Sequence, residues 1–427
     1  MKEKQQSNTI EPQEGLPEFS YWKRRAALFL AGQTVSLFGS SLVQFAIIWY
    51  ITLSTQSGSM MTIATVCGFA PQVVISLFSG VWADRFNRRM LIIGADAMTA
   101  VATLVLALFF LAGYRDYWII FIVVGIRSLG QGIQTPAVNA LLPQIVPAEK
   151  LIRVGGINGS LQSLMFLLSP AASGAILSVA SLENTFFIDV GTAAAAILIM
   201  SLLKVPLHKK ALEKQKGGYF DDLKAGVRYA FKNGFLRSYF IFFAIFMFFA
   251  VPAAQLTPLM VARVFGGDAA LASFADVQLL SFTEIAFSVG SVVGGIIITA
   301  WGGFKNRTRT IGMGGVLFGI FTALLGVVGG FTAFLIVVAI TGFSMPLFST
   351  PAMVLLQEQV PADMHGRVFS LVQIVMTGML PLGMIFFGPL ADKVPVQSLF
   401  VISGILFAIV AVSSFFNRHF KRGLVAE

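Results

Sequence analysis

Charged residues and cysteine are both scarce in this chain. Only 12% of its 427 residues are Asp, Glu, Lys or Arg, against about a quarter in a soluble domain. The single cysteine, Cys67, cannot form an internal disulfide. The three histidines, at 208, 365 and 419, lack metal-ligand spacing. No G-x-x-x-x-G-K-[ST] loop and no nucleophile–base pair can be recognised. We therefore expect no enzyme activity, no metal site, no cofactor and no direct use of ATP.

Long apolar runs take the place of the missing charge. Hydrophobic residues make up 56% of the chain, and the mean hydropathy is +0.82. A helix crosses the hydrocarbon core of a membrane with about 20 apolar residues, and it satisfies its own backbone polar groups there. We predict an all-α integral membrane protein with twelve transmembrane helices. The predicted spans are 26–54, 60–83, 89–112, 117–142, 154–180, 186–205, 238–264, 277–302, 309–330, 332–354, 367–391 and 396–416.

The basic residues are distributed unevenly between the two predicted sides of the membrane. With the N-terminus inside, 26 of the 30 Lys and Arg residues lie on the inner side. Arg115, Arg263 and Lys393 fall in outer loops, and Arg127 lies within a span. Positive loops stay on the cytoplasmic side, so we predict two cytoplasmic termini in the cell (inner) membrane. Topology and anionic lipid headgroups account for the net charge of +10 without nucleic acid.

The two halves of the chain repeat one pattern. TPAVNALLPQIVPAEKLIRV (135–154) matches TPAMVLLQEQVPADMHGRV (350–368), and Trp82 and Asn87 correspond to Trp301 and Asn306. Matching segments lie at the same inter-helix position of each half, as in transporters built from two parallel six-helix repeats. The predicted division is a cytoplasmic tail (1–25), a first bundle (26–205), a cytoplasmic linker with an amphipathic helix (206–236), a second bundle (237–418) and a cytoplasmic tail (419–427).

Several motifs add a resemblance to a known family. GVWADRFNRRML (80–91) resembles the loop signature of the major facilitator superfamily, usually written G-x-L-A-D-R-x-G-R-K. GIRSLGQG (125–132) resembles that family's fourth-helix arginine motif. LIIGADAMTA, GIRSLGQGIQTPAVNALLP, SFTEIAFSVGSVVGG and GRVFSL together resemble the macrolide-efflux branch of its drug:proton antiporters. The resemblance covers roughly residues 22–422.

The resemblance implies a fold and a function. The fold would be the major facilitator fold, with two pseudo-symmetric six-helix bundles. The function would be proton-coupled secondary active export of bulky amphiphilic drugs such as macrolides, by alternating access. Export of a siderophore or another endogenous metabolite is the alternative, because related branches share these motifs. The expected partners are small amphiphilic molecules, protons and membrane lipids, and the expected state is a monomer.

The 80–89 loop carries more charge than topology alone requires. In the family, its Asp and the basic residues after it link this loop to neighbouring inner helix ends, including the start of the span predicted at 367–391. The resemblance thus implies a conformational gate, whereas a solvated topology loop is the alternative. Asn87 replaces a family glycine, and we expect it to keep a left-handed turn. The predicted gate residues are Gly80, Asp84, Arg85, Arg88, Arg89 and Arg367.

Four charged side chains fall within predicted spans: Asp96, Arg127, Asp189 and Glu284. Such a group at mid-membrane costs about 2.5–3.5 kcal/mol, so each needs a partner, a wet cavity or a proton. An acid that gains or loses a nearby Arg during transport would bind and release a proton. We predict Glu284, then Asp96, as proton carrier with Arg127 as modulator. A permanent Asp96–Arg127 ion pair is the alternative, and Asp189 is predicted to be structural.

Polar side chains at helical spacing indicate a path through the interior, because such stripes would be costly against lipid. Helix–helix contact is the alternative for the serines. The many Phe and Met residues, 41 and 16, suit a broad apolar cavity around this path. The predicted cavity residues are Gln33, Ser36, Gln131, Gln134, Gln162 and Gln255.

Overall fold

A computed structural model of the chain describes residues 21–203, 205, 227–267, 271, 275–361 and 364–416, and the regular structure in these ranges is helical. Twelve helical segments in them are long and apolar enough to cross a membrane, which confirms the predicted number of spans. The helices are α1 (Trp22–Thr55), α2 (Gly58–Arg85), α3 (Arg88–Leu111), α4 (Tyr117–Ile145), α5 (Ala148–Val179), α6 (Leu182–Ser201), α8 (Gly234–Gln255), α9 (Thr257–Val264), α10 (Asp276–Trp301), α11 (Arg307–Leu325), α12 (Phe331–Gln359), α13 (His365–Ala391) and α14 (Val396–Phe416). α8 and α9 together form one span.

Most helix ends agree with the predicted spans to within a few residues, but α5 begins at Ala148 instead of 154. The helix extends past the apolar run because Pro147, with its fixed φ, can act as its N-cap. The predicted linker, residues 206–236, lies mostly outside the described ranges. Among its described residues, 227–232 are helical.

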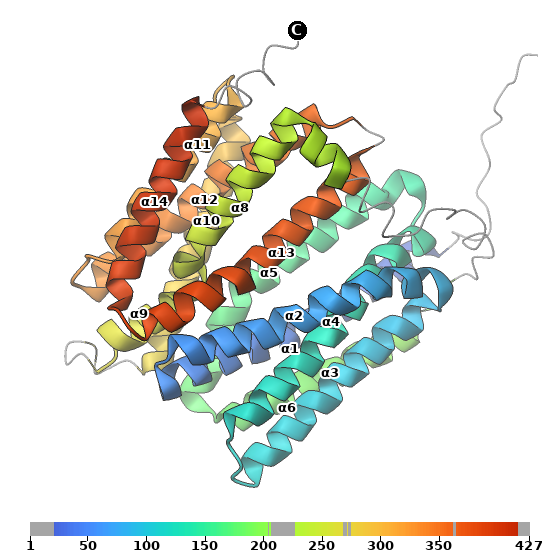
Figure 1. Ribbon diagram of the computed structural model, residues 1–427. Helices are drawn as coiled ribbons and strands as arrows, with labels where there is room; N and C mark the ends of the chain where they lie inside the picture. Colours follow the sequence, from blue (N-terminus) through green and yellow to red (C-terminus); the bar gives the residue numbers. More distant parts are fainter. Residues whose placement is uncertain are drawn as a thin grey trace, which may run out of the picture.

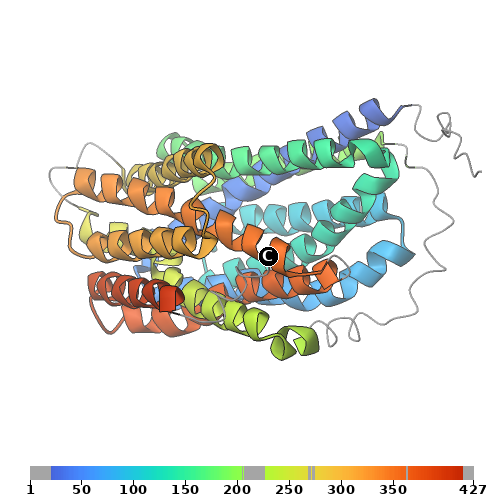
Figure 2. The same cartoon turned by 90° about the horizontal axis from the view of Figure 1, so that it is seen from above.

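The helices form two bundles, α1–α6 and α8–α14 (Figure 1). Two helix pairs make most of the contact between them: α2 packs against α13, and α5 packs against α10, while α1 also touches α9 and α10. Because α10 and α13 are the second and fifth spans of their half, each bundle offers its second and fifth spans to the other. This reciprocal pairing is what a pseudo-two-fold relation between the halves requires. Seen from above, the spans of both bundles run roughly alongside one another (Figure 2), and Figure 1 shows that the bundles diverge away from the end where α2 and α13 meet.

The repeated asparagines begin the third span of each half. Asn87 Oδ1 accepts hydrogen bonds from the backbone N–H groups of Arg89 (3.1 Å) and Met90 (3.4 Å) at the start of α3. Asn306 does the same for Thr308 (3.0 Å) at the start of α11. Asn87 has φ −63° and ψ 110°, so the expected left-handed turn is wrong. The residue is a helix N-cap, a position that asparagine favours.

The two ends of the molecule differ. We call the end where α1 begins and α14 ends the tail end, and the opposite end, which carries the α1–α2 turn, the closed end. At the closed end α2 and α13 converge (Figure 1). Gly58 faces Gly388 there, and a Cβ added at Gly388 would lie 2.6 Å from the Gly58 carbonyl oxygen. Thr62 Oγ1 donates to the carbonyl of Met384 at 2.8 Å.

An apolar cluster fills the space behind this helix crossing. Trp49 of α1 and Met61 of α2 are buried in the same cluster as Met260 of α9 and Phe265 beyond it. Each is at most 4% exposed, so the bundles exclude water at the closed end. Burying side chains of this size contributes about 1.5–3 kcal/mol each.

Further from the closed end, α5 and α10 touch through small residues. Ser281 Oγ donates to the carbonyl of Pro170 at 3.1 Å, and a Cβ at Gly174 would lie 2.4 Å from the Ser281 Cβ. Closer to the tail end, a Cβ at Gly155 or Gly159 would meet nothing within 4 Å, and Ile152 is 90% exposed. The bundles are therefore sealed at the closed end, while this face of α5 has no neighbour near the tail end in the described part of the chain.

We expect Gly388→Ala to force α2 and α13 apart at the closed end. The added methyl would lie 1.8 Å from Thr62 Oγ1, far inside van der Waals contact, and overpacking of this kind costs about 1–3 kcal/mol. Distances between spin labels on the two bundles should shift toward a more open closed end. The control is Gly378→Ala in the same helix, where a Cβ has nothing within 4 Å. An unchanged distance distribution in Gly388→Ala would contradict this interpretation of the crossing.

Candidate functional site

A buried ion pair lies inside the first bundle. Arg127 of α4 and Asp189 of α6 are 3% and 1% exposed, and their side chains are 2.5 Å apart (Nη1 to Oδ2). Thr103 Oγ1 of α3 donates to the same carboxylate oxygen at 2.9 Å, and Arg127 Nη2 donates to the carbonyl of Ser40 at 3.2 Å. Both charges are thus neutralised within one bundle, as a buried pair requires.

This ion pair replaces the Asp96–Arg127 pair that was the predicted alternative, while the role of Arg127 as modulator stays a prediction. The sequence predicted Arg127 beside a proton carrier, or in a permanent pair with Asp96. In the structure its carboxylate partner is Asp189, and no hydrogen bond or ion pair joins it to Asp96 or Glu284 in the described part of the chain. The sequence pattern could not decide between the two acids, since either can face α4 from a neighbouring helix. Arg127 holds α3, α4 and α6 together around Asp189.

Asp96 has only neutral partners. This α3 side chain is 3% exposed, and its Oδ1 accepts hydrogen bonds from Ser36 Oγ of α1 (2.7 Å) and Gln134 Nε2 of α4 (2.8 Å). No cationic side chain of the described residues pairs with it. Neutral donors can serve a carboxylate and a protonated carboxyl alike, so this site can gain or lose a proton without breaking either hydrogen bond. Ser36, Asp96 and Gln134, which the sequence predicted for different roles, thus form one hydrogen-bonded cluster.

Glu284 lies alone on α10. It is half-buried, and its side chain forms no hydrogen bond or ion pair with any described residue. On the helix it lies between the strip that contacts α5 at Ser281 and the strip whose Gly290 and Gly294 contact α12. That position faces the interface between the bundles, one turn from the Ser281–Pro170 contact toward the tail end. An unpaired carboxyl there requires water, a proton or a cationic ligand.

The glutamines of the predicted cavity are more scattered. Gln33 lies one turn from Ser36 on α1, and its Nε2 is buried without a partner in the described part of the chain. Gln131 is half-buried. Gln162 is exposed on α5, and Gln255 ends α8 at its junction with α9. The structure joins Ser36 and Gln134 through Asp96 but makes no hydrogen bond from Gln162 or Gln255 to them.

The arginines of the predicted gate bind helix ends of their own bundle. Arg88 donates to the carbonyls of Ala83 (2.8 Å) and Ala140 (3.1 Å), and Arg89 donates to the carbonyl of Ser201 (2.5 Å). The carbonyls of Ala83 and Ser201 lie in the last turns of α2 and α6, where a cation is favourable, and that of Ala140 lies one turn before the end of α4.

The rest of the predicted gate remains a prediction. Gly80 has nothing within 4 Å of an added Cβ, and Arg85 is exposed. The side chains of Asp84 and Arg367 lie outside the described part of the structure.

Sequence reasoning missed a bidentate pair in the second bundle. Arg307 of α11 donates through Nε and Nη2 to both carboxylate oxygens of Glu358 on α12, at 2.7–3.0 Å. Arg307 follows Asn306 directly, as Arg88 follows Asn87, so the repeat itself was a signal for it. Both arginines join the start of the third span of their half to the fourth span.

Twelve candidate spans in two bundles, with a buried carboxyl inside the first bundle and a half-buried one on the helix that meets it, are the arrangement of a polytopic membrane transporter. A model described as Major Facilitator Superfamily matches residues 29–377 and 275–426. The chain belongs to this superfamily.

Individual relatives agree with this assignment. The chain is 31% identical to Macrolide efflux protein A of Streptococcus pyogenes, over 93% of this chain and 96% of that protein. It is 30% identical to the protein of the same name from Enterococcus faecalis, over 77% of this chain and 100% of that one. The Staphyloferrin A transporter of Staphylococcus aureus is 23% identical over 92% and 96%. Among solved structures, the nucleoside transporter NupG (D323A mutant) superposes with a TM-score of 0.71, at 16% identity, over 92% of this chain and 99% of that one. These proteins are transporters and not enzymes.

We expect Arg127→Gln to destabilise the protein strongly and Asp96→Asn to be tolerated. The first change leaves Asp189 buried without its cation, which costs about 3–5 kcal/mol. The second change keeps an oxygen that can accept from Ser36 and Gln134. Thermal unfolding and the folded fraction of detergent-purified protein measure both effects. The double variant Arg127→Gln/Asp189→Asn should recover most of the loss. An Arg127→Gln protein as stable as the wild type would remove the structural role of the pair.

Proposed function

We propose that this protein is a proton-coupled secondary active exporter of bulky amphiphilic molecules, macrolides among them, that works by alternating access. Membership of the superfamily and about 30% identity to two macrolide efflux proteins support the substrate class. The observation that carries proton coupling is the presence of Asp96 and Glu284, two carboxyls within spans that have no cationic partner in the described part of the chain. We further propose that it acts as a monomer, without a cofactor.

The charge distribution supports an orientation in the cell membrane. The tail end carries the 80–89 loop with three arginines, and the α10–α11 turn with Lys305, Arg307 and Arg309. Positive loops remain cytoplasmic, so the tail end would face the cytoplasm and the closed end the outside. In this orientation the structure is sealed toward the outside, which is one of the two states that alternating access requires.

The two carboxyls suit a proton exchange between the bundles. Asp96 keeps its two neutral hydrogen bonds in either protonation state, whereas Glu284 depends on whatever occupies the inter-bundle space. A potential of about 100 mV and a gradient of about one pH unit supply roughly 3.7 kcal/mol per proton. One proton per cycle can therefore sustain a gradient of several hundredfold for a neutral drug.

A second candidate function is the export of a siderophore or another endogenous metabolite. The 23% identity to the Staphyloferrin A transporter over 92% of the chain favours it. The two candidates share the fold and the coupling chemistry, so the substrate must be identified by transport. Drug susceptibility in an efflux-deficient host, with and without a protonophore, distinguishes a drug exporter from a metabolite exporter.

We expect Glu284→Gln and Asp96→Asn each to reduce drug-stimulated proton flux in proteoliposomes by at least about tenfold, because an amide cannot carry the proton. Glu149→Gln is the control, since it removes an exposed carboxylate at the start of α5. Protein amounts are matched before the flux is compared. If both carboxyl variants keep full coupling, these two acids are not the proton carriers.

A further inference from the structure

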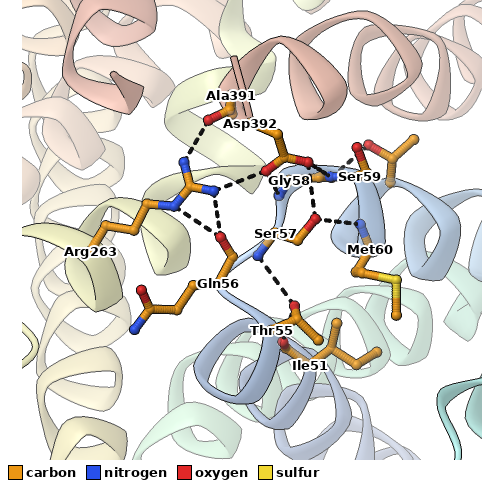
Figure 3. Close-up of polar contacts among 11 residues, drawn as sticks. Ile51, Thr55, Gln56, Ser57, Gly58, Ser59, Met60, Arg263, Ala391 and Asp392 are labelled. Atoms are coloured by element: carbon orange, nitrogen blue, oxygen red, sulfur yellow. Dashed lines mark hydrogen bonds and ion pairs between the residues drawn. The ribbon is translucent and has the colours of Figure 1, made fainter. Parts of the chain in front are cut away.

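The closed end carries a polar cluster that the sequence motifs do not include. Arg263, near the end of α9, and Asp392, directly after α13, both belong to the second bundle. They contact the α1–α2 turn of the first bundle, residues Gln56 to Ser59 (Figure 3). Both are outer-loop residues in the predicted topology, where charged residues are few.

Asp392 binds the start of α2. Its Oδ1 accepts from the backbone N–H of Gly58 (2.7 Å), and its Oδ2 accepts from the N–H of Ser59 (2.8 Å) and from Ser57 Oγ (2.9 Å) (Figure 3). The first N–H groups of a helix have no partner within the helix, and the positive end of the helix dipole favours an anion there. A carboxylate of one bundle thus caps a helix of the other.

Arg263 binds the opposite kind of helix end. Its Nε donates to the carbonyl of Gln56 (2.9 Å), the left-handed residue that ends α1, and its Nη1 donates to the carbonyl of Ala391 (2.5 Å), the last residue of α13. The guanidinium also pairs with Asp392, at 2.9 Å from Nη2 to Oδ1. A cation is favourable at helix C-termini. Arg263 thus binds the C-terminal ends of α1 and α13, and Asp392 beside it binds the N-terminal end of α2.

These contacts divide into two groups when the bundles separate. The bonds from Arg263 to Asp392 and to Ala391 lie within the second bundle and can persist. The bonds to Gln56, Ser57, Gly58 and Ser59 cross to the first bundle and must break. The pair is therefore already assembled on one bundle before it meets the other.

We propose that Arg263 and Asp392 form a latch, preassembled on the second bundle, that grips the α1–α2 turn and sets the ratio of closed to open states at this end. The proposal rests on the alternating access proposed above. The neighbouring Gly58–Gly388 crossing lets the helices approach, and the latch supplies the directional bonds that hold them there. Its residues act on the conformational step, through contacts with helix ends.

The latch is tested by the separation of the bundles at the closed end. Spin labels replace Tyr114, in the α3–α4 turn, and Val327, after α11, which are both exposed; Cys67→Ser removes the native thiol. We expect Asp392→Asn and Arg263→Gln to raise the ratio of long to short label distances by roughly two- to thirtyfold, the range expected for charges at helix termini. Lys393→Gln, which removes an exposed neighbouring cation, should leave the ratio unchanged.

A further variant separates the charge of Arg263 from its hydrogen-bonding geometry. Arg263→Lys retains the charge but not the fork that reaches several acceptors at once, so it should also favour the open state. If Arg263→Gln fails to fold, Arg263→Lys and Asp392→Asn carry the comparison. A wild type that transports and shows both distances, with an unchanged ratio in Asp392→Asn, overturns the latch. A wild type without flux and with one distance under all gradients overturns alternating access instead.

The effect of Asp392→Asn should be the same at pH 8 and at pH 5. Partial burial acts to raise the pKa of Asp392, but hydrogen bonds from Ser59, Gly58 and Ser57 outweigh it and lower the pKa to about 2. A lowered pKa means that the stabilisation is present above the ordinary carboxyl range and is lost only as pH falls toward 2. Arg263 and Lys393 are the charged neighbours, and both stay cationic in this range. The ratio between variant and wild type is measured at both pH values; an effect that disappears at pH 5 would contradict an ionised Asp392.

Discussion

The cost of an unpaired charge in hydrocarbon is the constraint on which this structure depends. This cost allows only a few arrangements of a charged side chain inside a span, and the first bundle contains two of them. Arg127 and Asp189 neutralise each other across α4 and α6 with help from Thr103. Asp96, without a cation, is held by two neutral donors and can remain in place if it is protonated. Glu284 has neither arrangement, and it lies where the second bundle meets the first. The carboxyl with no hydrogen-bond or ion-pair partner in the described part of the chain is thus the one nearest the interface between the bundles.

The same constraint explains how the bundles meet. Glycine and serine lie where the helices of the two bundles cross, so that the backbones approach closely there, and large apolar side chains fill the space beside the crossing at the closed end. Gly58 and Gly388 do this at the closed end, and Gly174 and Ser281 do it further along. Arg88 and Arg89, by contrast, bind helix ends of their own bundle and hold its tail end together as one body. Bundles that are each held together by their own polar contacts suit the alternating access proposed above.

The sequence predicted the architecture well because the evidence for each span comes from many residues at once. Length and hydropathy predict twelve spans, and the repeated segments predict two similar halves. The pairing of individual charges was harder, because any of several acids can face Arg127 and the choice depends on helix rotation. Asn87 was misjudged since an N-cap and a left-handed turn favour the same residue. Arg263 and Asp392 were missed because they are far apart in sequence and match no motif. The distribution of charge did contain a signal: two of the three basic residues predicted outside, Arg115 and Arg263, each bind a carboxylate, Glu183 and Asp392.

The Arg263–Asp392 contact within the second bundle has a kinetic consequence. A latch whose halves came from different bundles would have to order two long side chains at each encounter, and that lost rotamer freedom would slow every return. Here the guanidinium and the carboxylate already restrain each other before the encounter, and their targets are backbone groups fixed by helix ends. Return to the sealed form should therefore be limited by the motion of whole bundles through the membrane, with little delay from side-chain search. Under the proton-coupled alternating access proposed above, such a gate would shut quickly behind a departing molecule and so limit leakage of protons in the unproductive direction.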